Sequence, residues 1–447
     1  MSDDTKIMRD AAERGVRYRQ TLGDRDVAPS PAAIAAVSGF DEALSQQGRD
    51  DTETLAMLDD IGSPASLAMA GPRFFGFVIG GSLPVTVAAN WLATAWDQNS
   101  AMNEVTPAMA MLENVSRRWL CELLCLPQDA AASFVTGATI ANFTALAAAR
   151  HRVLANAGWD VERDGLIGAP ELTVIVGEEA HPTLTKSLGL LGLGRDRALR
   201  VPVDDQGRMI ADAVPAVSGP TIVCTQAGNI NTGAFDPVAE ICRVVRPAGA
   251  WVHVDGAFGL WAAAVPAMRH LLAGFDEADS WATDAHQWLN VPDDSGVAIT
   301  RDAAALKAAM AITADYLPTE TVSRNPSDYT PELSRRARGV EIWAALRSLG
   351  RRGVEDLIVR CCSHAKRFAQ GLGDAGYEIL NDVVLNQVLV SFGDDETTGR
   401  VIEEIQRDGT CWCGGTVWHG RRAMRISVCN WSTTEADVDV SLAAMVA

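Results

Sequence analysis

Between residues 133 and 300 the sequence alternates short apolar runs with longer helical segments, and this alternation limits the fold more than any other feature. Continuous apolar runs separated by helices are typical of parallel strands that are buried on both faces. We therefore expect an α/β domain with a mostly parallel, mixed sheet covered by helices. The expected strands are 133–136, 172–177, 221–227, 250–255, 280–283 and 296–300, and the expected helices are 141–157, 182–192, 236–246 and 262–273.

After about residue 330 the pattern changes to a mixture of helices and isolated strands. A helix containing 341–353 leads into a second helix over 354–371, and a last helix is expected from Thr434. Strands are expected around 377–392 and within 411–429, with a helix at 397–408 between them. We therefore predict an N-terminal helical segment (1–70), a large α/β domain (71–330) and a smaller C-terminal α+β domain (331–447).

Charge and composition exclude several classes of partner. The 447 residues include 38 basic and 57 acidic side chains, and the net charge of −19 opposes binding to nucleic acid or to an anionic membrane surface. The N-terminus is charged from its third residue, unlike a secretory signal, and prolines and Arg73 interrupt the most apolar region, 64–96. Nine scattered cysteines form no C-x-x-C pair, so we expect reduced thiols, no metal site and a cytoplasmic protein.

Three short segments combine a strand end with residues that can carry chemistry. In TGATIAN (136–142) a glycine turn enters a helix, whose N–H groups and the Thr139 hydroxyl can hold an anion. HVDGAFG (253–259) places Asp255 at the end of a buried strand, where a carboxylate needs a cation or a strong donor. His181 lies between another strand and a helix. Taken singly, each segment is explained as well by helix capping or core packing.

The order and spacing of these segments nevertheless resemble the group II amino-acid decarboxylases that use pyridoxal 5′-phosphate (PLP). The resemblance extends from GPRFFGFVIGGSLP to MRISVCNWSTTEADVD, and it includes QAGNINTGAFDP, DSWATDAHQW and TPELSRRARGVEIWAALRSLGRRG. It implies the aspartate-aminotransferase fold, known as fold type I. It also implies a homodimer in which parts of 73–81 and 315–335 approach the partner's pocket.

The resemblance assigns roles in cofactor binding to eight residues. His181 would stack on the pyridine ring, Asp255 would pair with the protonated ring nitrogen, and Ala257 would pack against the ring. The phosphate would bind at Gly137, Ala138, Thr139 and His286, and Asn229 would lie near the phenolic oxygen. Candidate substrate contacts are Arg425, near the substrate carboxylate, Phe77 in the segment that approaches the pocket, and Asp293, which would attract a cationic group if it faced the pocket.

Gln287 occupies the position at which this family carries the Schiff-base lysine. That lysine tethers the cofactor, speeds exchange with the incoming amine and moves protons, whereas an amide is neither basic nor nucleophilic at neutral pH. The chain has four lysines, of which Lys186 is the least implausible substitute. Gly71, Ile79 and Asp293 also depart from the family pattern, which favours divergence around one pocket over an isolated laboratory change.

Two hypotheses for function follow. In the first, the chain is an enzyme that acts on an amino acid or amine with non-covalently held PLP, and decarboxylation is the leading reaction, with Gln287, Asp255 and His181 in the active site. In the second, the same pocket serves a PLP-independent enzyme or a regulatory pseudo-enzyme that binds another ligand. The sequence leaves the substrate open, as well as whether carbon dioxide is released.

Overall fold

A seven-stranded sheet forms the centre of the large domain in the computed structural model, which describes residues 3–312 and 324–447. Its strand order is β1-β7-β6-β5-β4-β2-β3. The pairings of β7 with β1 and β6 are antiparallel, and all the others are parallel. This confirms the expected mixed, mostly parallel sheet. The strands are β1 (Ala131–Val135), β2 (Thr173–Gly177), β3 (Leu199–Val201), β4 (Thr221–Gln226), β5 (Trp251–Asp255), β6 (Ser280–Asp284) and β7 (Gly296–Thr300).

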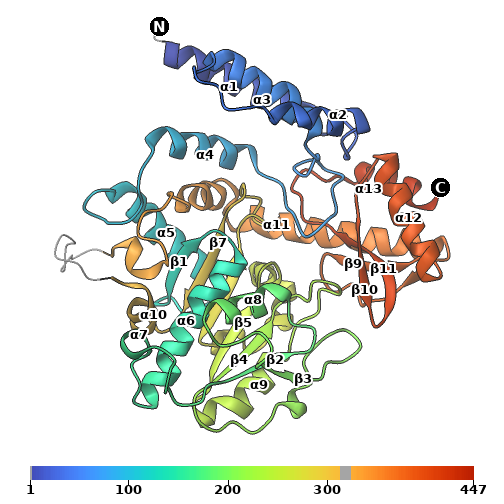
Figure 1. The fold of residues 1–447 in the computed structure, drawn as a ribbon. Helices are drawn as coiled ribbons and strands as arrows, with labels where there is room; N and C mark the ends of the chain where they lie inside the picture. Colours follow the sequence, from blue (N-terminus) through green and yellow to red (C-terminus); the bar gives the residue numbers. More distant parts are fainter. Residues whose placement is uncertain (1–2, 313–323) are drawn as a thin grey trace.

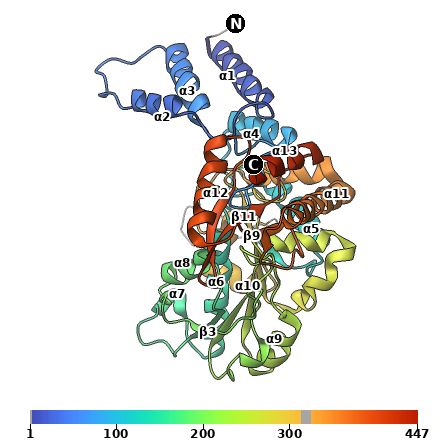
Figure 2. The same ribbon diagram turned by 90° about the vertical axis from the view of Figure 1, so that its right-hand side faces the viewer.

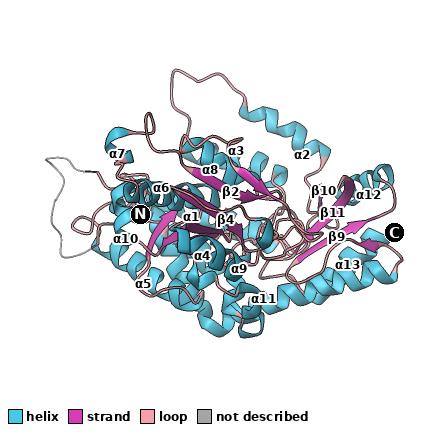
Figure 3. Cartoon of the chain, turned by 90° about the horizontal axis from the view of Figure 1, so that it is seen from below, coloured by secondary structure: helices cyan, strands magenta, loops and turns pink. Residues whose placement is uncertain are grey.

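Helices bury both faces of this sheet, which explains why its strands are continuously apolar. Ile222 and Cys224 of β4 belong to a buried cluster with α6 and α8, whereas Val223 between them belongs to a cluster with α5 and α9. The strands accordingly lie between α8 and α9 when the molecule is seen from below (Figure 3). The helices are α5 (Pro107–Leu123), α6 (Ala138–Asn156), α7 (Val161–Asp164), α8 (Pro182–Leu190), α9 (Val238–Val245) and α10 (Ala303–Met310).

Some details of the large domain differ from the sequence prediction. The helix expected at 262–273 is replaced by two 3₁₀ helices, η4 (Gly259–Ala264) and η5 (Pro266–Leu272). Pro266 explains the break, because it lacks an N–H and disfavours helical geometry at the preceding residue, Val265, which is extended. The short edge strand β3 was not expected; two of its three residues are exposed, so it lacks an apolar signature.

The C-terminal region forms a four-stranded antiparallel sheet of order β10-β11-β9-β8. The two helices expected before it are present as the two parts of α11 (Gly339–Asp374), and the backbone between them is non-helical at Gly350, with φ 60°, rather than near residue 353. The last helix starts where it was expected, with a capping box between Thr434 and Asp437. The other elements are β8 (Glu378–Ile379), β9 (Gln387–Ser391), α12 (Asp395–Asp408), β10 (Gly414–Trp418), β11 (Arg421–Ser427) and α13 (Glu435–Val446).

The N-terminal helices α1 (Asp3–Gln20), α2 (Pro31–Ala36) and α3 (Asp51–Ala65) extend away from the rest of the chain (Figures 1 and 2). The chain then passes along the small domain, where Phe75 N donates to Trp412 O at 2.9 Å, before α4 (Pro84–Trp96) begins. α4 leaves Trp91 and Trp96 nearly half exposed. No helix in the two described ranges is long and apolar enough to cross a bilayer.

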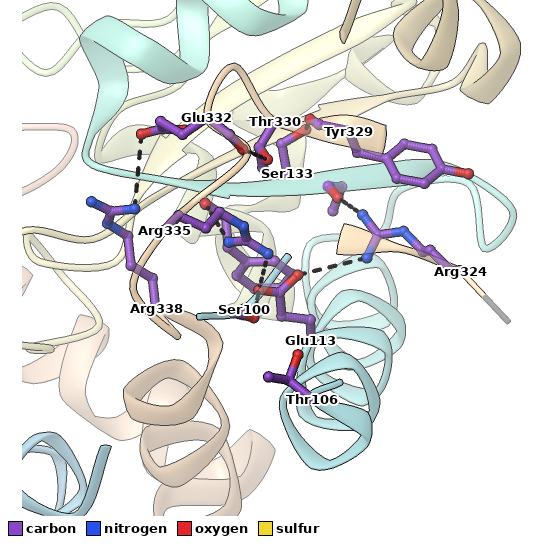
Figure 4. A network of polar contacts seen from close by, with 12 residues as sticks. Ser100, Thr106, Glu113, Ser133, Arg324, Tyr329, Thr330, Glu332, Arg335 and Arg338 are labelled. Atoms are coloured by element: carbon purple, nitrogen blue, oxygen red, sulfur yellow. Dashed lines mark hydrogen bonds and ion pairs between the residues drawn. The ribbon is translucent and has the colours of Figure 1, made fainter. Parts of the chain in front are cut away.

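A buried ion network fixes the segment after residue 324 to α5 and β1 (Figure 4). Arg335 pairs with Glu113 of α5 and donates to Phe134 O at 3.1 Å, and both charged side chains are almost completely buried. Arg324 contacts the same carboxylate at 3.8 Å. Arg335 therefore lies inside the protein. Residues 315–323, part of the segment expected near a partner's pocket, fall outside the described ranges.

Candidate functional site

A cavity of about 330 Å³ lies where the carboxyl ends of β1, β2, β4, β5 and β6 meet. Because β7 is antiparallel to both β1 and β6, those two strands point the same way and both end at this edge. The volume is that of a small-molecule site. The lining residues are Phe77, Thr136, Gly137, Ala138, Thr139, His181, Thr183, Gln226, Gly228, Ile230, Asp255, Ala257, Phe258, Asp284, His286 and Gln287.

One end of the cavity is formed by the turn between β1 and α6. Gly137 caps α6, and within the described ranges no side chain accepts from the first N–H groups of this helix. The turn is tightly packed: a Cβ on Gly137 would lie 3.1 Å from His286 Cε1, and a Cβ on Gly296 would lie 2.4 Å from Gly137 Cα. The helix therefore turns its positive end and its uncapped amides to a cavity in which an anion can approach the backbone.

His181 both caps α8 and lines the cavity. Its Nδ1 accepts from Thr183 N at 3.3 Å and lies 2.7 Å from Thr183 Oγ1. Nδ1 is thus the unprotonated nitrogen of the neutral ring, and Nε2 carries the proton. The capping role weighed for this histidine is real, and it fixes the orientation of the imidazole in the cavity wall.

Asp255 is held at the end of β5 by a chain of buried hydrogen bonds. Its Oδ2 accepts from Asn142 Nδ2 at 3.0 Å, and Asn142 Oδ1 lies 2.8 Å from His253 Nε2. His253 Nδ1 lies 2.8 Å from Ser280 Oγ, which accepts from Trp251 Nε1 at 2.8 Å. Because Asn142 Nδ2 donates to the carboxylate, its Oδ1 accepts from the His253 Nε2–H, and Nδ1 of the neutral imidazole accepts from the Ser280 hydroxyl. Every donor in this series of hydrogen bonds therefore points toward the Asp255 carboxylate.

Burial shifts the pKa values of the two ionisable groups in this series of hydrogen bonds, His253 and Asp255. Burial lowers the pKa of His253 to about 3, so the imidazole is neutral and serves as a relay of hydrogen bonds. Burial also raises the pKa of Asp255, and the hydrogen bond from Asn142 acts in the opposite direction. A cation at the cavity face of Asp255 would favour its ionised form.

Sequence reasoning missed Asn142 and His253, although both left a signal. His253 lies two residues before Asp255 in a strand, hence on the same side, and Asn142 lies one helical turn after Ala138. The hydrogen bond between Asn142 and His253 forms because α6 crosses β5, and this crossing cannot be predicted from the local sequence pattern.

At the end of β6, Asp284 organises the next three residues. Its side chain is buried, and its Oδ2 accepts from Gln287 Nε2 at 2.7 Å and lies 3.4 Å from His286 Nε2. Burial favours the neutral form of His286, but the bond to Asp284 and the charges of Asp293 and Asp294 prevail and raise its pKa. His286 is thus suited to contact an anion. Asp284 itself was not among the candidates, although it is part of the quoted TDAHQW segment.

Nine of the twelve predicted site residues line this one cavity, and three do not. Asn229 lies in a turn in which its Oδ1 accepts from Asn231 N at 2.8 Å. Asp293 is mostly exposed, and its carboxylate reaches His286 Nδ1 at 3.3 Å from outside the cavity. Arg425 lies on β11 of the small domain, where it is half-buried.

The residues present fit PLP. The uncapped start of α6 and His286 can hold its phosphate, His181 can lie against the ring, and buried Asp255 can face the ring nitrogen. No lysine lines the cavity: Lys6, Lys186, Lys307 and Lys366 are all exposed.

The model of the pyridoxal-dependent decarboxylase conserved domain matches residues 40–393, well over half of the sequence. The chain belongs to this family. Among curated members, tryptophan decarboxylase 1 of Oryza sativa subsp. japonica is 26% identical over 82% of the chain and 78% of its own length. L-2,4-Diaminobutyrate decarboxylase of Rhizobium meliloti is 30% identical over 76% and 66%, and the bovine acidic amino acid decarboxylase is 28% identical over 65% and 57%.

Solved structures confirm the predicted fold type. Mouse CSAD superposes with a TM-score of 0.90 at 23% identity, covering 99% of this chain and 97% of its own. The Oryza sativa TDC complex with PLP and tryptamine gives 0.90 at 22% identity, covering 100% and 97%. Family membership also confirms that the chain is of the decarboxylase, or carboxy-lyase, type and that its cofactor class is PLP.

Proposed function

We propose that this chain is a decarboxylase-like enzyme that acts on an amino acid or amine with PLP held non-covalently in the cavity. The observation that carries the proposal is the convergence of Thr139, His181, Asp255 and His286 on one cavity whose lining includes Gln287 but no lysine. When bound, PLP supplies an electron sink for the pair that is left as carbon dioxide departs.

The chain's own residues would supply binding, orientation and electrostatics. The start of α6 and His286 bind the phosphate, and His181, fixed by Thr183, holds the ring plane. Asp255 keeps a proton on the ring nitrogen, because its hydrogen-bonded chain through Asn142 supports the carboxylate form. Gln287 neither tethers the cofactor nor transfers protons, so exchange with the incoming amine is slow.

Borohydride reduction tests the absence of a tether. After incubation with PLP, removal of free cofactor and reduction, we expect no cofactor attached to a cavity peptide of the wild-type chain. The variant Gln287→Lys should acquire a reducible covalent adduct at position 287, and it should then be assayed for amino-acid decarboxylation. A wild-type adduct on a cavity peptide would contradict the proposal. A lysine variant that fails to bind PLP covalently would count against the pocket itself.

The second function, a PLP-independent enzyme or a pseudo-enzyme, is favoured by the bond between Gln287 and Asp284, which uses polar groups of the chain at the position of the missing lysine. In that case Asp255 and His181 serve as acid and base for another ligand. Calorimetric titration separates the two functions, since only the first requires that one PLP molecule bind per chain.

We also propose a homodimer with the site near the subunit interface. The exposed Trp91, Leu92 and Trp96 of α4 support it, because a second subunit would remove this apolar surface from water. Sedimentation at several concentrations measures the oligomeric state, and a monomer at micromolar concentration would contradict the proposal.

A further inference from the structure

The amide of Gln287 has a fixed orientation in the cavity wall. Its Nε2 donates to Asp284 Oδ2 at 2.7 Å, and an ionised carboxylate only accepts, so the NH₂ end must turn toward Asp284. The amide oxygen, Oε1, is consequently the end of the side chain that can accept a hydrogen bond from a ligand. Gln287 Oε1 is buried, and no described residue donates to it. A buried acceptor without a donor costs free energy, which a ligand with a donor would recover.

Asp284 carries a second unsatisfied acceptor. Its Oδ1 is buried and also receives no hydrogen bond within the described ranges, although the side chain is only 2% exposed and lines the cavity. Two acceptors on adjoining side chains therefore await donors at the position where the family carries an ammonium group.

The charge of the lining points the same way. Among the residues that the structure describes, the lining includes the carboxylates of Asp255 and Asp284 but neither lysine nor arginine. Residues 313–323 contain neither lysine nor arginine. The imidazoles of His181 and His286 are the remaining basic groups of the lining. A ligand that brings a positively charged donor is therefore complementary to this wall, whereas an aldehyde oxygen would oppose one acceptor with another.

We propose that Gln287 Oε1, held in place by Asp284, is an acceptor site for a primary ammonium group, so that the ligand supplies the cation that the chain lacks. This inference rests on the proposed cofactor site. The ammonium can come from two sources: the aminomethyl group of the cofactor's amine form, pyridoxamine phosphate, or the amino group of a substrate bound beside the cofactor. In both cases the group donates to Gln287.

Calorimetry on the full-length protein tests the first source. Pyridoxamine phosphate is compared with 4-deoxypyridoxine phosphate, which carries a methyl group in place of the aminomethyl group and shares every other contact. We expect pyridoxamine phosphate to bind about tenfold more tightly or better, as is typical of a hydrogen bond to a charged group. Gln287→Met, which keeps the length of the side chain but lacks the acceptor, should abolish the difference. Gln370→Met, at an exposed site on α11, should leave it unchanged.

The second source is tested with protein saturated by 4-deoxypyridoxine phosphate, which has no aldehyde and so cannot react. Titration with methylamine should show saturable binding to the wild type that Gln287→Met weakens by about tenfold or more. A preference in either titration that depends on Gln287 supports the inference and identifies the source. If neither titration depends on Gln287 while both phosphates bind, the ammonium site is refuted and the cofactor site stands. If neither phosphate binds, the proposed function itself fails.

Discussion

Replacing Asn142 by leucine should destabilise the protein strongly, because this side chain joins two groups that are almost completely buried. The variant removes the bond from Nδ2 to Asp255 Oδ2, 3.0 Å, and the bond from His253 Nε2 to Oδ1, 2.8 Å. Asp255 is 5% exposed and His253 is fully buried. Leucine is of similar size, so the change tests hydrogen bonding more than packing.

The magnitude follows from the two partners that are left unsatisfied. A buried donor or acceptor without a partner costs about 1–3 kcal/mol, with more for a charged group, so the pair should cost roughly 3–6 kcal/mol. The loss should be smaller at low pH. Burial already raises the pKa of Asp255, removal of the Asn142 donor raises it further, and the protonated carboxyl tolerates the loss of that donor better.

Urea unfolding followed by tryptophan fluorescence measures this loss as a shift of the midpoint. Asn156→Leu, at the exposed end of the same helix, is the matched control and should change the unfolding free energy by less than about 0.5 kcal/mol. A loss of under about 1 kcal/mol in Asn142→Leu would refute the inference that the hydrogen bonds linking Trp251, Ser280, His253, Asn142 and Asp255 together stabilise the fold.

Three further changes test other parts of the structure. Glu113→Leu leaves Arg335 buried without its carboxylate and should cost about 3–5 kcal/mol in unfolding free energy, whereas Glu122→Leu on the exposed face of α5 should cost less than about 1 kcal/mol; equal losses would contradict the pairing. Burial raises the pKa of Asp236 to about 6, so its contribution to stability is present below about pH 4 and is lost as the pH rises through about 6. Relative to Asp236→Asn, the wild type should lose about 2 kcal/mol between about pH 4.5 and about pH 7, and parallel pH profiles would exclude this. Gly296→Ala should weaken the affinity for pyridoxamine phosphate by about tenfold, since its Cβ would lie 2.4 Å from Gly137 Cα, and unchanged affinity in a calorimetric titration would show that the turn needs no such close approach.

The sequence by itself determined the α/β class and most of the elements. Short continuous apolar runs separated by helical segments are typical of strands covered on both faces, and this alternation is visible without any knowledge of neighbours. Functional residues of such sheets follow strand ends, which drew attention to Asp255 and His181, but their roles and the candidate Gln287 came from the family resemblance. The predicted helix at 262–273 and the predicted helix boundary near residue 353 differ from the structure, and in both places proline or glycine interrupts an otherwise helical pattern.

Only the tertiary structure decided which of these residues meet. Local periodicity reports that a strand is buried but not which strand lies beside it, and the pairing of Ala131 with Thr300 brings together segments far apart in the chain. The same holds for side chains: the Asn142 bond to Asp255 depends on how α6 crosses β5. The direction of the Gln287 amide depends on Asp284, three residues away, turning its carboxylate inward. A sequence lists donors and acceptors, but the packed chain decides which of them are left for a ligand.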